Sequence, residues 1–350
     1  MQIHEAARKF GRGEHLTRTE AHAVMEELLS GTVPDPDIVQ FLAALRDKGE
    51  RAEELVGFAE VMRAHASEGL RRAGVDPEKL AMGQPLLDTC GTGGDGQGTF
   101  NVSTAAALVV AAAGVRVAKH GNRSISSRCG SADVLEALGV ALDLPFERIP
   151  ACLEEVGMVF LFAPRLHLAM KHVMNARRSL KTKSVFNLLG PLTNPLQATV
   201  QLLGVYDRAR TEMMAQTLAA VGTERAFVVA GHDGLDEITL TGRTRLSECE
   251  GGVVHSRDVA PEDFGLPRAS AEALKGGDLA TSARLFCRVL EGEPGPRRDV
   301  VLANASAALV AAGKAADFLA GVEQARAALD SGAALAKLRA LAIFTQKFAG

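Results

Sequence analysis

The chain has 350 residues, which predicts about two domains at the usual ~150 residues per domain. Its 47% hydrophobic and 23% charged residues are typical of a globular protein with a sizeable core, and a net charge of −3 argues against a dedicated DNA-binding domain. An aromatic content of 4% argues against base-stacking platforms for single-stranded nucleic acid.

The five cysteines show no paired spacing. None forms a CxxC motif, so we expect free thiols in a reducing cytosol rather than a zinc site or a disulfide framework. The first residues lack the apolar stretch of a signal peptide, and the longest run of small apolar residues, 105–115, has about half the length of a membrane span. We therefore expect a cytoplasmic protein that binds neither membranes nor nucleic acid.

Residues 1–72 are predicted to be helical throughout. Apolar residues recur there with the 3.6-residue period, and no strand pattern occurs before Pro85. Thr17 followed by Glu20 is typical of a capping box, in which each side chain binds the other residue's backbone N–H at a helix start. This segment therefore predicts a helical domain at the N-terminus.

From Leu86 the pattern changes to short apolar runs that are separated by helical patterns. This alternation predicts βαβ units and a mostly parallel sheet. The predicted parallel strands are residues 86–90, 115–120, 158–162, 200–206 and 225–232. Residues 235–242 and 251–259 are expected to add an antiparallel extension, and the residues after 300 return to helices. The fold class is therefore α/β.

A glycine-rich loop follows the first predicted strand and precedes a predicted helix. Five glycines fall within residues 91–98, and Ser103 or Thr104 can serve as the N-cap of the helix. Glycines allow backbone N–H groups to approach an anion, and a helix N-terminus adds a partial positive charge. A Walker A loop requires a GKS or GKT triplet after the glycines, and a dinucleotide-binding fingerprint requires an acidic residue about 20 positions on. This sequence has neither. We therefore expect this loop to bind phosphate.

Acidic residues are absent from two stretches near this loop. Residues 97–131 and 157–205 contain no Asp or Glu, although each holds several basic residues. Such segregation in a chain of net charge −3 predicts a focused positive cleft. Lys119 comes directly after a predicted strand, and the carboxyl ends of parallel strands face the ligand crevice.

The segment KHGNRSISS at residues 119–127, together with the glycine-rich loop, resembles the anthranilate phosphoribosyltransferases of tryptophan biosynthesis. The resemblance continues in order through GSADVLEALGV, NLLGPLTNP, GHDGLDEIT and the C-terminal stretch that begins LANASAAL. It therefore covers nearly the whole chain. The family transfers the 5-phosphoribosyl group of phosphoribosyl pyrophosphate to the amine of anthranilate and releases pyrophosphate, so the resemblance implies this reaction here.

The resemblance also implies an architecture similar to that of the pyrimidine nucleoside phosphorylases. A small all-helical domain is hinged to a larger α/β domain with a mostly parallel central sheet flanked by helices. We expect residues 1–72 to form the helical domain, with residues 164–188 packed onto it, and residues 73–163 and 189–350 to form the α/β domain. The resemblance further implies a homodimer formed through the helical domains and two Mg²⁺ ions per subunit.

Expected site residues are those that match the family's motifs. Phosphoribosyl pyrophosphate is expected to bind at Gly91, Gly94, Asp95, Thr99, Asn101, Val102, Ser103, Thr104, Lys119, His120, Gly121, Asn122, Arg123, Ser124, Ile125, Ser126, Ser127 and Ser131. Anthranilate is expected at Gly91, Asn122 and Arg177, and Mg²⁺ at Ser103, Asp236 and Glu237. Two positions depart from the family's usual residues, since Lys183 stands where many relatives have Arg and Cys129 where they commonly have Ser.

Asp236 and Glu237 also stand out from the residues themselves. They are an adjacent acidic pair after a glycine-containing turn at a predicted strand end. Mg²⁺ prefers hard oxygen ligands and usually bridges one or two carboxylates to substrate phosphates. Glu154 and Glu155, by contrast, lie within a helix pattern and are expected on a solvated helix face.

Phosphoribosyl transfer needs electrostatic stabilisation and positioning more than proton transfer. Positive charge develops on the ribose and negative charge on the departing pyrophosphate, whereas a neutral aryl amine needs little activation. We therefore assign no catalytic residue. His120 is open to two interpretations, a hydrogen-bonding loop residue or a general base, and His167 is as compatible with packing or solvent exposure as with substrate contact.

Two other functions are weighed against this one. A nucleoside phosphorylase would share the fold and the glycine loop, but the Lys-His-Ser segment that typically opens its loop is replaced here by Asp88-Thr89-Cys90. A non-catalytic nucleic-acid-binding relative would reuse the basic cleft. The retention of Lys119, the Asp236–Glu237 pair and the full glycine loop argues against it, as does the net charge.

Overall fold

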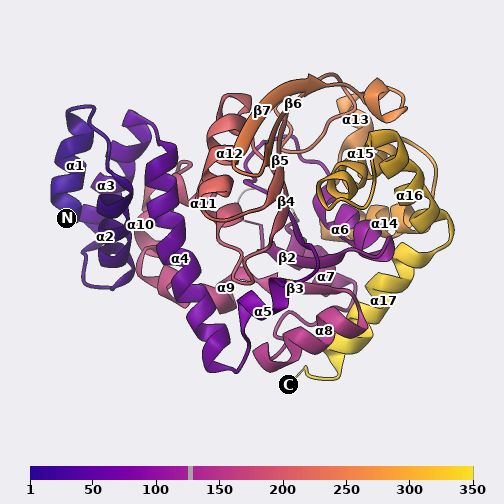
Figure 1. The fold of residues 1–350 in the computed structure, drawn as a ribbon, viewed down its shortest axis with the longest axis horizontal. Helices are drawn as coiled ribbons and strands as arrows, with labels where there is room; N and C mark the ends of the chain where they lie inside the picture. The colour runs from indigo at the N-terminus through magenta and orange to yellow at the C-terminus, as the bar shows by residue number, and fades with distance from the viewer. Residues whose placement is uncertain (125–128, 350) are drawn as a thin grey trace.

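The computed structural model describes residues 1–124 and 129–349. Ile125, Ser126 and Ser127, which are expected to bind the phosphoribosyl donor, lie outside the described residues. A group of helices stands beside a larger α/β body (Figure 1). In the described part of the chain no helix is long and apolar enough to cross a membrane.

The N-terminal segment is helical, as predicted. Its helices are α1 (Ile3–Gly11), α2 (Arg18–Leu29), α3 (Asp35–Lys48), α4 (Ala52–Arg72) and α5 (Pro77–Ala81). The capping box is confirmed, because the backbone N–H of Thr17 donates to the Glu20 carboxylate (2.9 Å) and that of Glu20 donates to Thr17 Oγ1 (3.3 Å). Phe10, Phe41 and Phe58 meet at the centre of this group, with successive ring centroids 5.5 and 6.3 Å apart.

A seven-stranded sheet forms the centre of the α/β body. Its strands are β1 (Leu86–Gly91), β2 (Arg116–Gly121), β3 (Met158–Phe162), β4 (Val200–Gly204), β5 (Arg225–Gly231), β6 (Thr244–Glu250) and β7 (Val253–Val259). Their order is β3-β2-β1-β4-β5-β6-β7, in which β1 to β5 are parallel and β6 and β7 antiparallel. All five predicted parallel strands are therefore confirmed, and so is the mostly parallel sheet.

The antiparallel extension begins later than predicted. Residues 235–242 form a loop between β5 and β6, and the extension consists of β6 and β7. The loop alternates apolar and polar residues like a strand, but side chains satisfy its polar groups. The hydroxyls of Thr239 and Thr241 donate to the Asp233 carboxylate (2.7 and 2.6 Å), and the Asn304 amide binds the backbone of Ile238. Such local and side-chain bonds compete with strand pairing.

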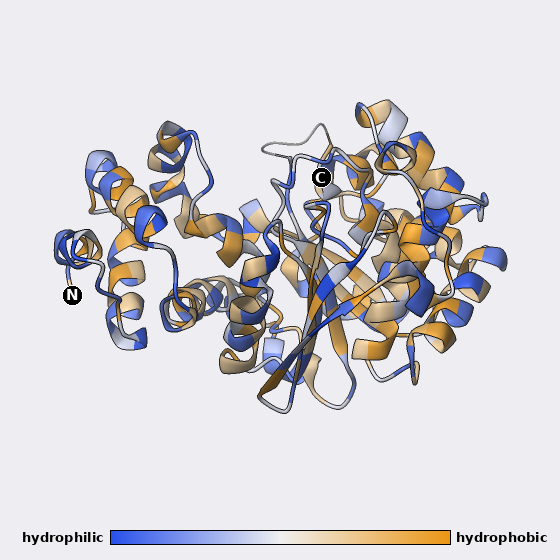
Figure 2. Ribbon diagram, turned by 90° about the horizontal axis from the view of Figure 1, so that it is seen from above, coloured by the Kyte–Doolittle hydropathy of each residue, from blue (hydrophilic) through white to orange (hydrophobic). Residues whose placement is uncertain are grey.

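Alternate residues of the strands pack against helices on opposite faces of the sheet. Phe227 and Val229 of β5 belong to one apolar cluster with α6 (Val102–Ala112) and α15 (Pro296–Ala311), whereas Val228 and Ala230 belong to a second cluster with α12 (Thr211–Ala220). The other helices beside the sheet are α7 (Ser131–Ala137), α8 (Ile149–Glu155), α13 (Ala271–Leu274), α14 (Leu279–Leu290), α16 (Phe318–Asp330) and α17 (Ala333–Gln346). Hydrophobic residues concentrate on the strands and on the helix sides that face them (Figure 2).

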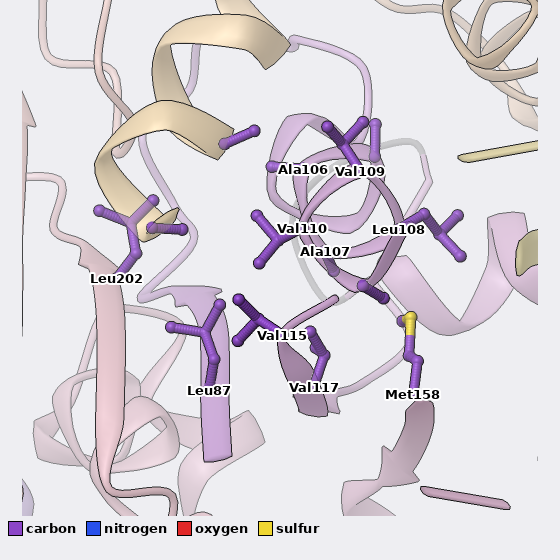
Figure 3. Close-up of a cluster of buried hydrophobic side chains, with 14 of the residues drawn as sticks. Leu87, Ala106, Ala107, Leu108, Val109, Val110, Val115, Val117, Met158 and Leu202 are labelled. Carbon is purple, nitrogen blue, oxygen red and sulfur yellow. The ribbon is translucent and has the colours of Figure 1, made fainter. Parts of the chain in front are cut away.

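Helix α6 fills the centre of the first cluster. It consists almost entirely of Ala, Val and Leu, so it can be buried on every side. Val110 of α6 lies close to Leu87 of β1, Val117 of β2 and Leu202 of β4 (Figure 3). This packing holds the start of α6, and with it the glycine-rich loop, at the carboxyl ends of the parallel strands.

The chain returns to the N-terminal helices between β3 and β4. This connection contains α9 (Ala163–Leu166), η2 (Leu168–His172), α10 (Met174–Leu180) and α11 (Val185–Leu192). Val173 and Ala176 lie in the same apolar cluster as Phe41 and Leu45 of α3. The boundaries of the two domains stay a prediction.

Candidate active site

A cavity of about 330 Å³ lies at the carboxyl ends of β1 and β2. It is lined by the glycine-rich loop, the end of β2, the start of α7, parts of α10 and α11, and the β5–β6 loop. Every expected site residue within the described parts of the chain lines this cavity. The structure thus brings together segments that are up to about 150 residues apart, while the ligand that each residue binds stays a prediction.

The glycine-rich loop connects β1 to α6 in a conformation that needs glycine. Gly93, Gly94, Gly96 and Gly98 have φ values of 64° to 74°, a region that other residues rarely adopt. The N-cap of α6 is Asn101, so the prediction of Ser103 or Thr104 is wrong. The helix starts earlier because the Ser103 backbone N–H donates to Glu237 Oε1 (3.1 Å) from inside the first turn.

Thr104 and Lys119 provide hydrogen-bond donors beside this loop. The hydroxyl of Thr104 is buried and has no hydrogen-bond partner among residues 1–124 and 129–349, so it is available to a ligand in the cavity. Lys119 is 1% exposed, and its Nζ donates to the carbonyl of Thr89 and to Ser103 Oγ. Burial lowers the pKa of Lys119, while Asp88 and other nearby acidic groups oppose that shift.

Asp236 and Glu237 approach the glycine-rich loop from the β5–β6 loop. The backbone N–H of Gly93 donates to Asp236 Oδ2 (2.8 Å). A Cβ at Gly204, at the end of β4, would overlap the backbone of Asp236, so only glycine there allows the close approach. Burial, followed by repulsion from Asp95, raises the pKa of Asp236 to about 7, and burial together with Asp236 raises that of Glu237.

These carboxylates fit a Mg²⁺ site. Buried carboxylates that repel one another are stabilised by a divalent cation, and carboxylate and hydroxyl oxygens are ligands that Mg²⁺ prefers. Among the described residues, no three or more acidic, His or Cys side chains gather around a single point. The protein would therefore supply few ligands, and substrate phosphates the others, as is usual for Mg²⁺.

Arg177 lines the cavity from α10. Its guanidinium lies 5.8 Å from the ring centroid of Phe186, and burial lowers its pKa. In the part of the chain that the structure describes, Arg177 has no acidic partner. A partly buried cation without a counterion is a site for an anionic group, whereas the neighbouring Arg178 is exposed.

Comparisons with known proteins agree with this geometry. Residues 4–66 match the family described as "Glycosyl transferase family, helical bundle domain". Residues 83–335 match the family described as "Glycosyl transferase family, a/b domain". An anthranilate phosphoribosyltransferase from Solibacter usitatus is 54% identical over 331 residues, which cover 95% of each chain. The chain belongs to the anthranilate phosphoribosyltransferase family.

Solved structures of this family share the fold. The anthranilate phosphoribosyltransferase from Thermus thermophilus is 44% identical, with a TM-score of 0.87 over 97% of this chain and 99% of that one. The enzyme from Saccharomyces cerevisiae, in complex with phosphoribosyl pyrophosphate and Mg, is 27% identical, with a TM-score of 0.86 over 99% of this chain and 98% of that one. It is also known in complex with 4-fluoroanthranilate. A small helical domain beside a larger α/β domain is therefore shown for this chain.

One part of the cavity wall is formed by residues that were not predicted from the sequence. Phe186, Asn187, Gly190 and Pro191 of α11 form its wall beside Arg177. They belong to the segment NLLGPLTNP or directly precede it, and this segment contributed to the resemblance with the phosphoribosyltransferases. Its Gly-Pro pair within an apolar run, inside the acid-free stretch 157–205, was the signal that could have identified this wall.

The two residues that depart from the family's usual pattern lie near the glycine-rich loop. Lys183 packs against Gly94, and its Nζ lies 3.4 Å from the ring centroid of Tyr206. Its positive charge therefore lies beside the loop. Cys129 lines the cavity, and its carbonyl accepts from Asn101 Nδ2 (3.2 Å).

His120, which lines the cavity, forms a pair with His167. Their Nε2 atoms are 3.2 Å apart, and burial lowers the pKa of His120 to about 3 and that of His167 to about 4. A ring with such a low pKa is a poor proton acceptor at neutral pH. The structure therefore favours the hydrogen-bonding interpretation of His120 and places His167 as its packing partner.

Proposed function

We propose that the chain transfers the 5-phosphoribosyl group of phosphoribosyl pyrophosphate to the amine of anthranilate, giving N-(5-phosphoribosyl)anthranilate and pyrophosphate in tryptophan biosynthesis. The observation that carries this proposal is one cavity with the glycine-rich loop on one side and, on the other, Arg177, which has no acidic partner among the described residues. The names of the relatives support the same reaction and give no support to a nucleoside phosphorylase or a nucleic-acid-binding protein.

The donor is held on the side of the glycine loop. Residues 91–95, 98 and 99 of the glycine-rich loop, the start of α6 and the buried Lys119 line the same cavity. A helix N-terminus and a buried ammonium group stabilise negative charge. These groups favour departure of pyrophosphate because negative charge increases there as the bond to the ribose breaks.

Ser103, Asp236 and Glu237 would hold Mg²⁺, and we propose two ions per subunit. When bound by these residues, Mg²⁺ would supply positive charge that offsets the negative charge of the carboxylates and of the donor. Without such charge, the two buried carboxylates would repel an anionic donor. The protein's contribution is to hold the carboxylates close to the loop, through Gly93 and the Ser103 backbone.

The acceptor is held on the side of α10 and α11. Arg177 binds the carboxylate of anthranilate, Asn122 and Gly91 lie between the two substrates, and Phe186 and Pro191 contact its ring. The aryl amine attacks as the neutral group, so the chain needs to orient it rather than deprotonate it. No side chain therefore acts as nucleophile or general base.

Two further features of the family belong to this proposal. We propose a homodimer formed through the helical domains, which sedimentation of the purified chain tests. The exposed Leu168 of η2, beside the helical domain, supports an interface in this region. A cytoplasmic location is supported by the family's biosynthetic role and by the free thiols of all five cysteines.

The reaction is tested by the loss of anthranilate fluorescence on mixing with phosphoribosyl pyrophosphate and Mg²⁺. We expect loss only when both are present, and none with ribose 5-phosphate in place of the donor. Release of a free base from a nucleoside and phosphate would instead indicate a nucleoside phosphorylase. A mobility shift of DNA that survives saturating donor would indicate the nucleic-acid-binding alternative.

A further inference from the structure

Asp88 is a buried acid that the proposed reaction does not use. It lies in β1 and is 0% exposed, and burial raises its pKa to about 6. Its Oδ1 accepts from the backbone N–H of His120 (3.1 Å), and its Oδ2 accepts from Asn194 Nδ2 (2.9 Å). A buried carboxylate is costly unless such bonds compensate it, so its position between two cavity segments needs a reason.

Asn194 lies in the turn between α11 and β4 and is 1% exposed. Besides Asp88, its Nδ2 reaches the carbonyl of Ala118 (2.8 Å), and its Oδ1 accepts from the backbone N–H of Leu196 (3.0 Å). The side chain therefore joins three segments, namely β1, β2 and its own turn. Both hydrogens of the amide are used, which leaves one orientation for the group.

The turn that contains Asn194 is also held from the N-terminal helices. Arg63 of α4 donates from Nε to the carbonyl of Leu192 (2.5 Å), and Ser67 of α4 donates to the carbonyl of Pro195 (3.0 Å). Asn194 lies between these two anchor points and faces the opposite way, toward β1 and β2. The bonds of Asp88 and Asn194 therefore connect the turn to the strands of the donor site.

Each end of this connection leads directly into a wall of the cavity. Ala118 precedes Lys119 and His120, which line the donor side. Pro191 and Gly190, which line the acceptor side, lie just before the turn. The hydrogen bonds through Asp88 and Asn194 therefore set the distance between the two walls.

We propose that Asp88 and Asn194 are a pair of positioning residues that hold the acceptor wall in register with the donor wall. This inference rests on the proposed function. Transfer requires the amine and the ribose carbon to be aligned at about 3–3.5 Å, and a misplacement of about 1 Å can cost about 100-fold in rate. Asn194→Ala leaves the contacts of Lys119 and of Pro191 within their own walls, so substrate binding is retained while the approach of the reacting atoms is lost. Asp88→Asn also removes a negative charge near Lys119.

The test is steady-state kinetics of Asn194→Ala and Asp88→Asn with both substrates varied. We expect kcat to fall by about 10- to 100-fold in both variants, with each KM changed by less than about 3-fold in Asn194→Ala. Asp88→Asn keeps the size of the side chain but replaces an oxygen that accepts a hydrogen bond by an amide NH₂ group. This group then faces another hydrogen-bond donor. The double variant is expected to lose no more than the larger single loss, because both changes break one connection.

Ser67→Ala is the matched control. It removes one buried hydrogen bond to the same turn without touching β1 or β2, so kcat should stay within about 2-fold of the unchanged chain. Circular dichroism and thermal unfolding establish whether each variant folds. If Asn194→Ala does not fold, Asp88→Asn alone is used for the test.

Two results would overturn the proposal. One is a kcat for folded Asn194→Ala and Asp88→Asn no lower than that of Ser67→Ala. The other is a rise in KM with unchanged kcat, which would make the pair part of one binding wall. Failure of the proposed function is a separate outcome, because the unchanged chain would then consume no anthranilate.

Discussion

Arg177 is the residue on which we expect binding of the acceptor to depend. Replacement by Ala should raise the KM for anthranilate by about 10- to 150-fold, because a charge-assisted hydrogen bond contributes about 1.5–3 kcal/mol. The KM for phosphoribosyl pyrophosphate should stay nearly unchanged. Arg178→Ala removes the same charge from the exposed next position and is the control. If Arg177→Ala weakens donor binding alone, the assignment is wrong and Arg178 becomes the residue to examine.

Asp236 and Glu237 are expected to act through Mg²⁺ and not through proton transfer. The double change Asp236→Asn with Glu237→Gln should raise the Mg²⁺ concentration for half-maximal rate by about 10- to 100-fold and lower turnover. Initial rates across a Mg²⁺ titration measure both. Glu154→Gln with Glu155→Gln removes the same charge from an exposed pair on α8 and should change neither. Normal turnover with unchanged Mg²⁺ dependence in the first variant would show that the acidic pair only solvates a loop.

The raised pKa of Asp236 makes the effect of Mg²⁺ depend on pH. The pKa of the Asp236 carboxyl is about 7 in the folded chain and 3.8 ordinarily. This carboxyl therefore binds its proton more tightly when the chain is folded. The stability of the metal-free protein should therefore fall as pH rises from about 4 to 7. Because Mg²⁺ binds the ionised form, it should raise Tm more at pH 8 than at pH 5.5. An equal rise at both pH values would contradict this.

At the scale of elements, α15 holds the acidic loop in place. Asn304 of α15 accepts from the backbone N–H of Ile238 (2.9 Å) and donates to its carbonyl (3.0 Å), directly after Glu237. Asn304→Ala should lower the free energy of unfolding by about 2–3 kcal/mol, since two buried backbone groups lose their partner, and should also weaken the response to Mg²⁺. Urea unfolding and a Mg²⁺ titration measure the two effects.

Ser306 provides the control on the same helix. It is equally buried, and its hydroxyl donates to the carbonyl of Phe318 (2.7 Å), away from the acidic loop. Ser306→Ala should lose about 1 kcal/mol of stability and leave the Mg²⁺ response unchanged. If both variants change that response equally, α15 affects the site only through overall stability.

At the scale of the whole molecule, we expect the cavity to close on its substrates. Its acceptor wall lies on α10 and α11, beside the N-terminal helices, whereas its donor wall belongs to the α/β domain. A cleft between two such parts usually closes when both ligands are bound. Small-angle scattering should show a smaller radius of gyration with both substrates than with neither. Identical profiles would indicate a rigid, preformed site.

Several features followed from the sequence alone because they depend on neighbouring residues. Helix periodicity identified residues 1–72, the capping box at Thr17 and Glu20 needs only four consecutive positions, and short apolar runs identified β1 to β5. The glycine loop was equally readable, since its φ values require glycine wherever the rest of the chain lies. The fold class could therefore be predicted from these local patterns, whereas the family and most of the residues around the cavity were predicted from the resemblance of the motifs.

Only the tertiary structure decided features that depend on distant partners. Residues 235–242 alternate like a strand, but Asn304, 66 positions from Ile238, occupies their backbone groups, so the strand begins at Thr244 instead. Asp88 and Asn194, 106 positions apart, meet because β1 lies between β2 and β4 in the sheet. Local propensity cannot specify such contacts, because their energy is gained only after the intervening chain has folded and brought both groups out of water.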